Sequence, residues 1–268
     1  MKVGIDIGGT ETKVVLCDDE LNVLEKNVLK TPHFQSEADF LSFIFSLVKS
    51  KNVDTLNLSL AGFVNQKRGG LEFSPNLNLK ISDLVGKLRR KFSGKVFIEN
   101  DVNCAALYLL KEYGIGNFVV LMVGTGLGSG VVCNGKLIRG GDGFGTEAGH
   151  MNYVEDGVLC GCGRRGCYEG YCSGIAFKRL KESGLDEDKI EKIMAEALFH
   201  LIYNLTSLLN PEVFFLGGGV IWNLSLFERV LDVFLKRGVL FSTKLEKLKE
   251  NKFISALGSI FLEESLKC

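Results

Sequence analysis

The chain of 268 residues carries 32 lysines and arginines against 32 aspartates and glutamates, so its formal net charge is zero. This balance argues against a general nucleic-acid binder, and a hydrophobic share of 46% with 24% charged residues excludes a disordered chain. No apolar run reaches the roughly 18 residues of a membrane helix, and we expect no signal peptide, so the sequence predicts a cytoplasmic protein without nucleic-acid or membrane partners. Eight cysteines in that setting indicate reduced thiols or metal ligands.

Hydrophobic periodicity predicts an α/β protein. In chain order we expect strands at 2–6, 14–17 and 22–29, a helix at 37–49, a strand at 56–60, a helix at 81–92, a strand at 96–98 and a helix at 104–113. Next come a strand at 118–123, a hairpin of 131–133 and 136–138, helices at 174–183 and 187–209, a strand at 213–216, a helix at 222–236, a strand at 253–256 and a helix at 260–266. Between residues 140 and 174 the periodicity disappears, which is typical of a functional or a disordered segment.

Three apolar strands end in glycine-rich turns, near Asp6, near Val123 and near Leu216. Ligands of open α/β sheets gather at strand ends, where bare backbone N–H groups can meet phosphate. We therefore predict that the three turns serve one nucleotide. The alternative is that they are ordinary turns.

The first of these turns follows Asp6 in the sequence DIGGTETK. Gly8 and Gly9 would allow close approach of the backbone, Thr10 offers a hydroxyl and Lys13 a cation, while Asp6 could act on Mg²⁺ through water. The sequence is not a Walker A motif. The alternative is a hairpin turn with a charged rim.

Asn100 and Asp101 lie where a predicted strand ends and a predicted helix begins. An acid at this place could act as a general base on a substrate hydroxyl. The alternative is simple N-capping of the helix by either residue.

A cysteine cluster is the most specific pattern in the chain. His150 is followed by a C-x-C-x₄-C group formed by Cys160, Cys162 and Cys167. Four such ligands suit one tetrahedral Zn²⁺ with no open position, which is a structural site. The alternative is free cysteines in a glycine-rich loop.

Glu147 and Glu169 flank this cluster. A loop braced by zinc could present both carboxylates to the hydroxyls of a polyol. The alternative is two solvated surface acids.

Taken together, these segments resemble the ROK family of sugar kinases, which includes glucokinases, fructokinases and N-acylhexosamine kinases. The resemblance covers nearly the whole chain. Its motifs are DIGGTETK at 6–13, LAGFV at 60–64, PNL at 75–77, ENDVNCAAL at 99–107, VGTGLGSG at 123–130, GTEAGH at 145–150, CGCGRRGCYE at 160–169 and NPEVFFLGGGV at 210–220.

The resemblance implies the actin-like, hexokinase-type ATPase fold (ribonuclease H-like), with two α/β domains and a cleft between them. We expect the N-terminal α/β domain at 1–115, completed by a C-terminal helix at 258–268. The C-terminal α/β domain is expected at 116–257, with the zinc-braced loop at 140–174.

The resemblance also implies roles for single residues, with ATP, Mg²⁺ and a structural Zn²⁺ as cofactors. Asp101 matches the catalytic base that takes the proton of the sugar 6-hydroxyl. The sugar-binding positions are Gly62, Asn76, Asn100, Asp101, Glu147, His150 and Glu169. The phosphate loops and the adenosine loop correspond to Asp6, Gly8, Gly9, Thr10, Lys13, Gly124, Thr125, Gly126, Gly217 and Gly218. His150, Cys160, Cys162 and Cys167 match the zinc ligands.

The chain departs from the family pattern at several positions. Ala61 stands where many members have proline, and Thr146 replaces a frequent glycine. Phe63 stands where N-acetylmannosamine-type members place a polar residue, which favours an unsubstituted hexose such as glucose. The segment between 174 and 210 is shorter than usual, which puts the contacts of a homodimer in doubt.

The sequence thus predicts a kinase that phosphorylates the 6-hydroxyl of a hexose, with glucose favoured. An N-acylhexosamine kinase or a fructose kinase of the same family is the alternative. More distant alternatives are an iron–sulfur ATPase activator of the same superfold and a non-catalytic sugar sensor.

Overall fold

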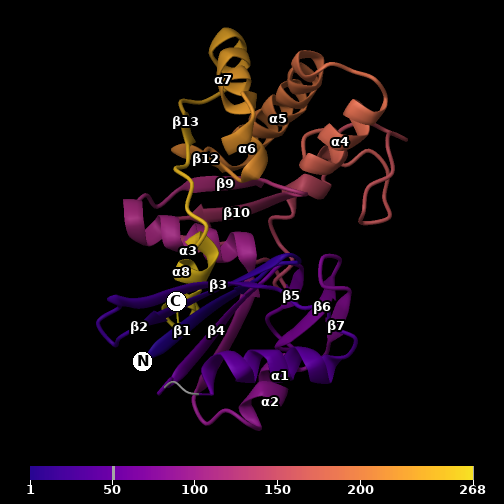
Figure 1. The fold of residues 1–268 in the computed structure, drawn as a ribbon. Helices are drawn as coiled ribbons and strands as arrows, with labels where there is room; N and C mark the ends of the chain where they lie inside the picture. Colours follow the sequence, from indigo (N-terminus) through magenta and orange to yellow (C-terminus); the bar gives the residue numbers. More distant parts are fainter. Residues whose placement is uncertain (50–51, 268) are drawn as a thin grey trace. The chain divides into compact units, whose positions relative to one another are not determined.

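The computed structural model describes residues 1–49 and 52–267, which form two compact units (Figure 1). Unit 1 contains Met1–Gly114, Arg139–Gly145 and the C-terminal segment from Asn251. Unit 2 contains Ile115–Ile138 and Thr146–Glu250. The chain therefore passes from one unit to the other four times.

The main sheet of unit 1 has the strand order β3-β2-β1-β4-β8. Two antiparallel pairs join β1, β2 and β3, and parallel pairs join β1 to β4 and β4 to β8. A smaller sheet has the order β5-β6-β7. The strands are β1 (Lys2–Ile7), β2 (Glu11–Cys17), β3 (Val23–Lys30), β4 (Thr55–Leu60), β5 (Phe63–Asn65), β6 (Gly70–Ser74), β7 (Leu79–Ile81) and β8 (Lys95–Asn100).

Helices cover both faces of the main sheet in unit 1 (Figure 1). They are α1 (Glu37–Val48), α2 (Leu84–Arg89), α3 (Asp101–Tyr113), α8 (Ile254–Ser259) and α9 (Leu262–Ser265). Ile5 packs in one core with Phe40 and Ile44 of α1. Successive residues of a strand face opposite sides of the sheet, so Gly4, next to Ile5, faces α8. A Cβ on Gly4 would overlap the backbone oxygen of Ala256.

The sheet of unit 2 has the order β11-β10-β9-β12-β13. Its strands are β9 (Phe118–Val123), β10 (Leu127–Cys133), β11 (Lys136–Leu137), β12 (Val213–Gly217) and β13 (Lys244–Lys247). Its helices are α4 (Gly174–Glu182), α5 (Glu187–Leu209), α6 (Gly219–Asn223) and α7 (Leu226–Arg237), with 3₁₀ turns at Ala148–His150 and Tyr168–Gly170. A second core forms where α5 and α7 pack with the sheet.

Several predicted elements are wrong in type or extent. The strand expected at 253–256 lies in a helical region, because Ile254 and Ala256 are buried as part of α8. The helix expected at 222–236 is two helices, α6 and α7, that meet at Leu224 and Ser225. Strand β13 was not expected, because KLEK has no apolar run and lies at the edge of its sheet.

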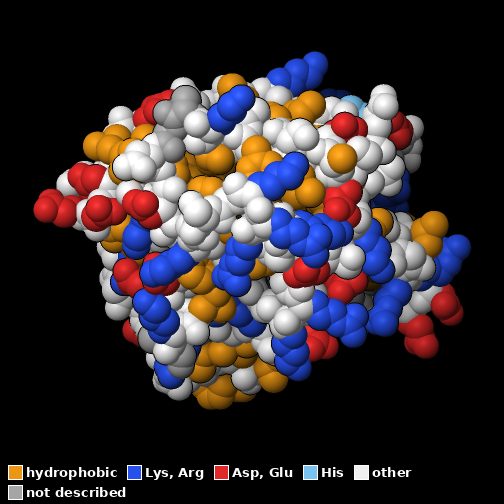
Figure 2. Space-filling view, turned by 90° about the horizontal axis from the view of Figure 1, so that it is seen from below, with side chains coloured by type: hydrophobic (Ala, Val, Ile, Leu, Met, Phe, Trp, Pro, Cys, Tyr) orange, Lys and Arg blue, Asp and Glu red, His pale blue; other side chains and the backbone are white. Residues whose placement is uncertain are grey.

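No helix in the described part of the chain is long and apolar enough to cross a membrane. Figure 2 shows one face of the molecule, where Lys and Arg side chains are interspersed with Asp and Glu side chains. This mixed surface agrees with the zero net charge of the chain.

Candidate active site

In unit 1, the turn between β1 and β2 brings Asp6 and Lys13 together. Lys13 Nζ lies 3.7 Å from Asp6 Oδ2, and Ser59 Oγ donates to Asp6 Oδ1 at 2.9 Å. Burial raises the pKa of the Asp6 carboxyl, and Lys13 and Ser59 oppose this effect. The turn is thus a hairpin with a charged rim, and it also gathers an acid and a cation beside two glycines.

Gly9 of this turn lies against Asn76, since a Cβ on Gly9 would be 3.0 Å from the backbone oxygen of Asn76. Both residues line a cavity of about 500 Å³ in unit 1. A residue of the predicted phosphate loop and one of the predicted sugar site are therefore neighbours within this unit.

Asn100 caps helix α3, and Asp101 is the first residue of that helix. The Asn100 side-chain oxygen accepts from the N–H groups of Val102 and Asn103 at 2.8 and 3.1 Å, and its nitrogen donates to the backbone oxygen of Gly62 at 3.1 Å. Asp101 Oδ1 accepts from Val102 N–H at 3.0 Å. The capping role is therefore real, and it fixes the place of the Asp101 carboxylate at the positive end of α3.

In unit 2, the predicted zinc ligands converge. The side-chain donor atoms of His150, Cys160, Cys162 and Cys167 lie within 4.8 Å of one another. Cys160 Sγ is 3.6 Å from His150 Nδ1, and Cys162 Sγ is 3.7 Å from Cys167 Sγ. Four ligands at about 2.3 Å from a tetrahedral zinc would lie about 3.8 Å apart, so the donor set and its spacing fit Zn²⁺.

Glu169 connects this cluster to the glycine turn after β9. Its Oε2 accepts from Leu127 N–H at 3.0 Å, and Cys160 Sγ donates to its Oε1 at 3.4 Å. Gly126 allows this approach, because a Cβ there would overlap the Glu169 carboxylate. Burial and the neighbouring Glu169 raise the pKa of Glu147 to about 7. The two acids thus form an interacting pair rather than two solvated surface groups.

The glycine turns after β9 and β12 also lie side by side. The strands are parallel neighbours, so both turns leave the same edge of the sheet. Gly218 has a φ of +98°, and a Cβ there would overlap the backbone of Val123. Unit 2 therefore brings Gly217 and Gly218 beside the turn at 124–126.

The predicted residues thus fall into two groups. Unit 1 holds Asp6, Gly8, Gly9, Thr10, Lys13, Gly62, Asn76, Asn100 and Asp101. Unit 2 holds Gly124, Thr125, Gly126, Glu147, His150, Cys160, Cys162, Cys167, Glu169, Gly217 and Gly218.

Two supporting residues were missed in the sequence. Ser59 holds Asp6, and Glu99 accepts the N–H of Asn100 at 2.9 Å. Both are polar residues inside buried strands. Because buried polar groups need partners, their presence in apolar runs was a usable signal.

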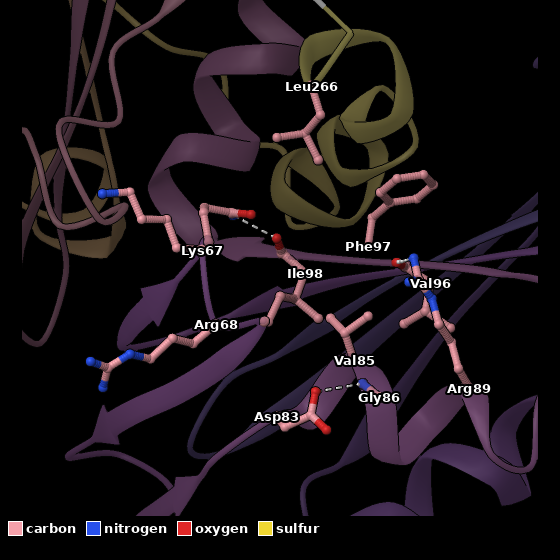
Figure 3. Close-up of a pocket in the computed structure, with 12 residues that line it drawn as sticks. Lys67, Arg68, Asp83, Val85, Gly86, Arg89, Val96, Phe97, Ile98 and Leu266 are labelled. Atoms are coloured by element: carbon pink, nitrogen blue, oxygen red, sulfur yellow. Dashed lines mark hydrogen bonds between the residues drawn. The ribbon is translucent and has the colours of Figure 1, made fainter.

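A second cavity of unit 1, of about 390 Å³, lies along β8, the edge strand of the main sheet (Figure 3). Of its lining residues, Gln66 donates from Nε2 to the backbone oxygen of Ile98 at 2.7 Å. Its lining residues are Gln66, Lys67, Arg68, Gly69, Asp83, Val85, Gly86, Arg89, Val96, Phe97, Ile98 and Leu266. The lining contains none of the predicted site residues.

Comparison with known proteins gives a consistent match. A model of the ROK family matches residues 2–252. Glucokinase of Streptomyces coelicolor is 35% identical over an alignment of 189 positions that covers 67% of this chain and 58% of that protein. Glucokinase of Thermotoga maritima is 28% identical and N-acetylmannosamine kinase of Vibrio cholerae is 29% identical, and each alignment covers 81% of this chain and 81% and 83% of the relative.

Solved structures match over almost the whole chain. A ROK family glucokinase from Streptomyces griseus, in complex with glucose and AMPPNP, has a TM-score of 0.81 and 24% identity, covering 100% of this chain and 99% of its own. A ROK hexokinase from Thermus thermophilus has a TM-score of 0.83 and 26% identity, covering 99% of each chain. The expected actin-like ATPase fold is confirmed by these matches.

Proposed function

The chain belongs to the ROK family, and on this premise we propose that it is an ATP-dependent kinase that phosphorylates the 6-hydroxyl of a hexose, with glucose preferred. The position of Asp101 carries the proposal, because a carboxylate at a strand-to-helix turn, held by a capped helix, suits a general base. The relatives named above include two glucokinases. The aligned part spans only 58% of the Streptomyces coelicolor enzyme, so the activity itself needs a direct test.

Asp101 takes the proton of the sugar hydroxyl as that oxygen attacks the γ-phosphate of ATP. Phosphoryl transfer needs mainly positioning and stabilisation of charge, which backbone N–H groups can provide. The phosphate and adenosine contacts in this proposal are Asp6, Gly8, Gly9, Thr10, Lys13, Gly124, Thr125, Gly126, Gly217 and Gly218. Asp6 would hold Mg²⁺ through water, and the ion would supply neutralisation of phosphate charge.

The sugar contacts in this proposal are Gly62, Asn76, Asn100, Asp101, Glu147, His150 and Glu169. Glu147 can donate or accept a hydrogen bond near neutral pH, since its pKa is about 7. His150 turns Nδ1 toward Cys160, which supports a sugar contact through Nε2. Zinc held by His150 and the cysteines would supply folding energy to the loop that carries Glu147 and Glu169.

The preference for glucose is supported by Phe63, which follows Gly62 and packs edge-on against Phe144 with ring centroids 6.2 Å apart. An apolar pair beside Gly62 offers no hydrogen bond to an acyl-amino substituent. For this substrate we propose a cytoplasmic role in glycolysis. The segment between 174 and 210 is shorter than usual for the family, which puts the contacts of a homodimer in doubt. Light scattering would show whether the protein forms a homodimer.

The decisive experiment is an assay of ADP release with a panel of hexoses and N-acylhexosamines, on the wild type and Asp101→Asn. We expect activity with glucose above all, and a loss of at least a thousandfold in kcat in the variant. Asp232→Asn, at an exposed ion pair of α7, is the control that should keep full activity. Full activity of Asp101→Asn would refute the assigned base, and preference for an N-acylhexosamine would replace the substrate.

A binding measurement with the sugars and an analysis of metal content separate the more distant alternatives. Tight sugar binding without phosphorylated product would identify a sensor. An iron-containing protein would identify an ATPase activator, whereas four donors from one chain within 4.8 Å support a single zinc.

A further inference from the structure

We propose that the buried ion pair of Glu99 and Arg139 is a positioning device for the reaction, with Arg139 holding the turn that carries Asp101. The inference rests on the proposed function for its kinetic test. Both residues belong to unit 1, and neither is proposed to touch the substrate.

Glu99 spans the turn between β8 and α3. Its side chain is completely buried, and its Oε1 accepts from Asn100 N–H at 2.9 Å and from Asn103 Nδ2 at 3.2 Å. Its Oε2 accepts from Arg139 Nε at 2.6 Å. One carboxylate thus braces the residue before Asp101 and the residue two positions after it, so any shift of Glu99 would shift the carboxylate of Asp101.

Arg139 connects Glu99 to a part of the chain that is distant in sequence. Its side chain is 15% exposed, and its Nη2 donates to Ser265 Oγ of α9 at 2.7 Å. The guanidinium therefore joins the β8–α3 turn to the C-terminal segment. A planar group with donors in a fixed fork suits this task better than a single ammonium does.

Arg139 also begins the short segment on which the chain returns to unit 1. In the sequence, this segment, Arg139–Gly145, separates the two pieces of chain that form unit 2. Gly145 N–H donates to the backbone oxygen of Arg139 at 2.8 Å, so the two ends of the segment are tied together. Thr146 and Glu147 follow directly. Through Arg139, one buried contact therefore links the turn of Asp101 to the segment Arg139–Gly145.

Stability alone is a weak reason for this arrangement. Replacing a buried ion pair by apolar side chains of similar size is often neutral or stabilising, because both charges lose their hydration on burial. Stability alone therefore does not explain why this pair lies directly beside the turn of the proposed base, and we assign the pair to the geometry of that turn. A displacement of about 1 Å of a positioned group can lower a rate about a hundredfold.

The test compares four variants by kcat, by KM for ATP and by melting temperature. Arg139→Gln leaves Glu99 without its ionic partner, and we expect kcat to fall at least tenfold with KM for ATP within twofold. Arg139→Lys keeps the charge and should recover part of kcat. Asp142→Asn is the matched control, because it removes an exposed ion pair with Lys67 from the same segment and should leave kcat within twofold.

The double variant Glu99→Gln with Arg139→Met separates positioning from stability. It leaves no buried charge without a partner, so its melting temperature should be closer to the wild-type value than that of Arg139→Gln, while kcat stays low. If kcat recovers together with the melting temperature, the pair is merely structural and the proposal fails. Wild-type kcat in Arg139→Gln would overturn it as well.

Amide hydrogen exchange tests the proposal without the activity. In the double variant, the N–H groups of Val102, Asn103 and Gly145 should exchange at least tenfold faster than in Asp142→Asn. Unchanged exchange at these amides would overturn the proposal. A wild type that phosphorylates none of the sugars refutes the proposed function instead, and the exchange result then decides the positioning role alone.

Discussion

At the scale of one residue, Glu263 forms ion pairs with two lysines of unit 1. Its Oε1 lies 2.6 Å from Lys95 Nζ and 3.0 Å from Lys267 Nζ. Hydrogen bonds from the two lysines lower the pKa of Glu263 to about 2. Because the folded form prefers the ionised carboxylate, this contact stabilises the fold above the ordinary pKa of a glutamate and loses that effect as the pH falls toward 2.

Glu263→Gln should therefore lower the free energy of unfolding at pH 7 by about 1 kcal/mol, the upper range for surface ion pairs. The difference from the wild type should shrink between pH 5 and pH 3, since the wild type gains protons there on unfolding. Urea unfolding at several pH values measures both effects. Glu250→Gln, at an exposed position, is the control. A difference independent of pH would contradict the explanation.

Asn100 illustrates what single residues reveal in advance. The sequence predicts either an N-cap or a sugar contact at this position, and the structure shows the cap with two accepted hydrogen bonds. The contact with Gly62 could not be predicted from local pattern, because it joins residues 38 positions apart. The sugar contact stays a prediction.

At the scale of elements, we expect the loop between β11 and α4 to depend on the proposed zinc site. This stretch has two 3₁₀ turns and isolated bridges in place of longer helices or strands. A segment with so little regular structure gains stability when four ligands are tied by one ion. The zinc cluster is thus expected to hold Glu169 beside the glycine turn after β9.

Removal of zinc by a chelator, or Cys162→Ser, should lower the melting temperature by at least 5 °C and raise the KM for the sugar at least fivefold. The two effects should appear together, because the same loop carries both the ligands and the two acids. Cys133→Ser, outside the cluster, is the matched control. Elemental analysis should give one zinc per chain. Unchanged values after loss of the metal would make the site incidental.

Long or strongly patterned elements were predictable from the sequence. The helix expected at 187–209 is α5, and the Asn134-Gly135 turn joins β10 to β11 with both residues at positive φ. Some short elements were also predicted correctly, such as the strands expected at 56–60 and 213–216, which are β4 and β12. Others were not, because four or five residues can fit either periodicity. Residues 253–256 are the example, since their helical state depends on burial against other parts of unit 1.

At the scale of the whole molecule, the two units have separate hydrophobic cores but are not two consecutive pieces of chain. The return of Arg139–Gly145 to unit 1 has no sequence signature, and the return of the C-terminal segment was expected only from the resemblance to the family. Both returns arise from contacts over more than a hundred residues, such as Arg139 with Ser265. Local pattern therefore predicts the elements of this fold better than the membership of each unit.

Gly258 shows how closely the C-terminal segment joins unit 1. Helix α8 packs against α3, and a Cβ on Gly258 would overlap the backbone oxygen of Cys104. Backbone on both sides leaves no flexible side chain to give way. Gly258→Ala should therefore push α8 away from α3 and lower the free energy of unfolding by about 3 kcal/mol, the upper range for overpacking.

Urea unfolding measures this loss, and Gly141→Ala is the control, because its Cβ would enter open space. Kinetics add a second readout. Helix α9 follows α8 and carries Ser265, which holds Arg139, so Gly258→Ala should also reduce kcat at temperatures where the protein is folded. Reduced stability with wild-type kcat would mean that the C-terminal segment closes the fold without any influence on the turn of Asp101. Full stability would mean that α8 can move away from α3 without loss.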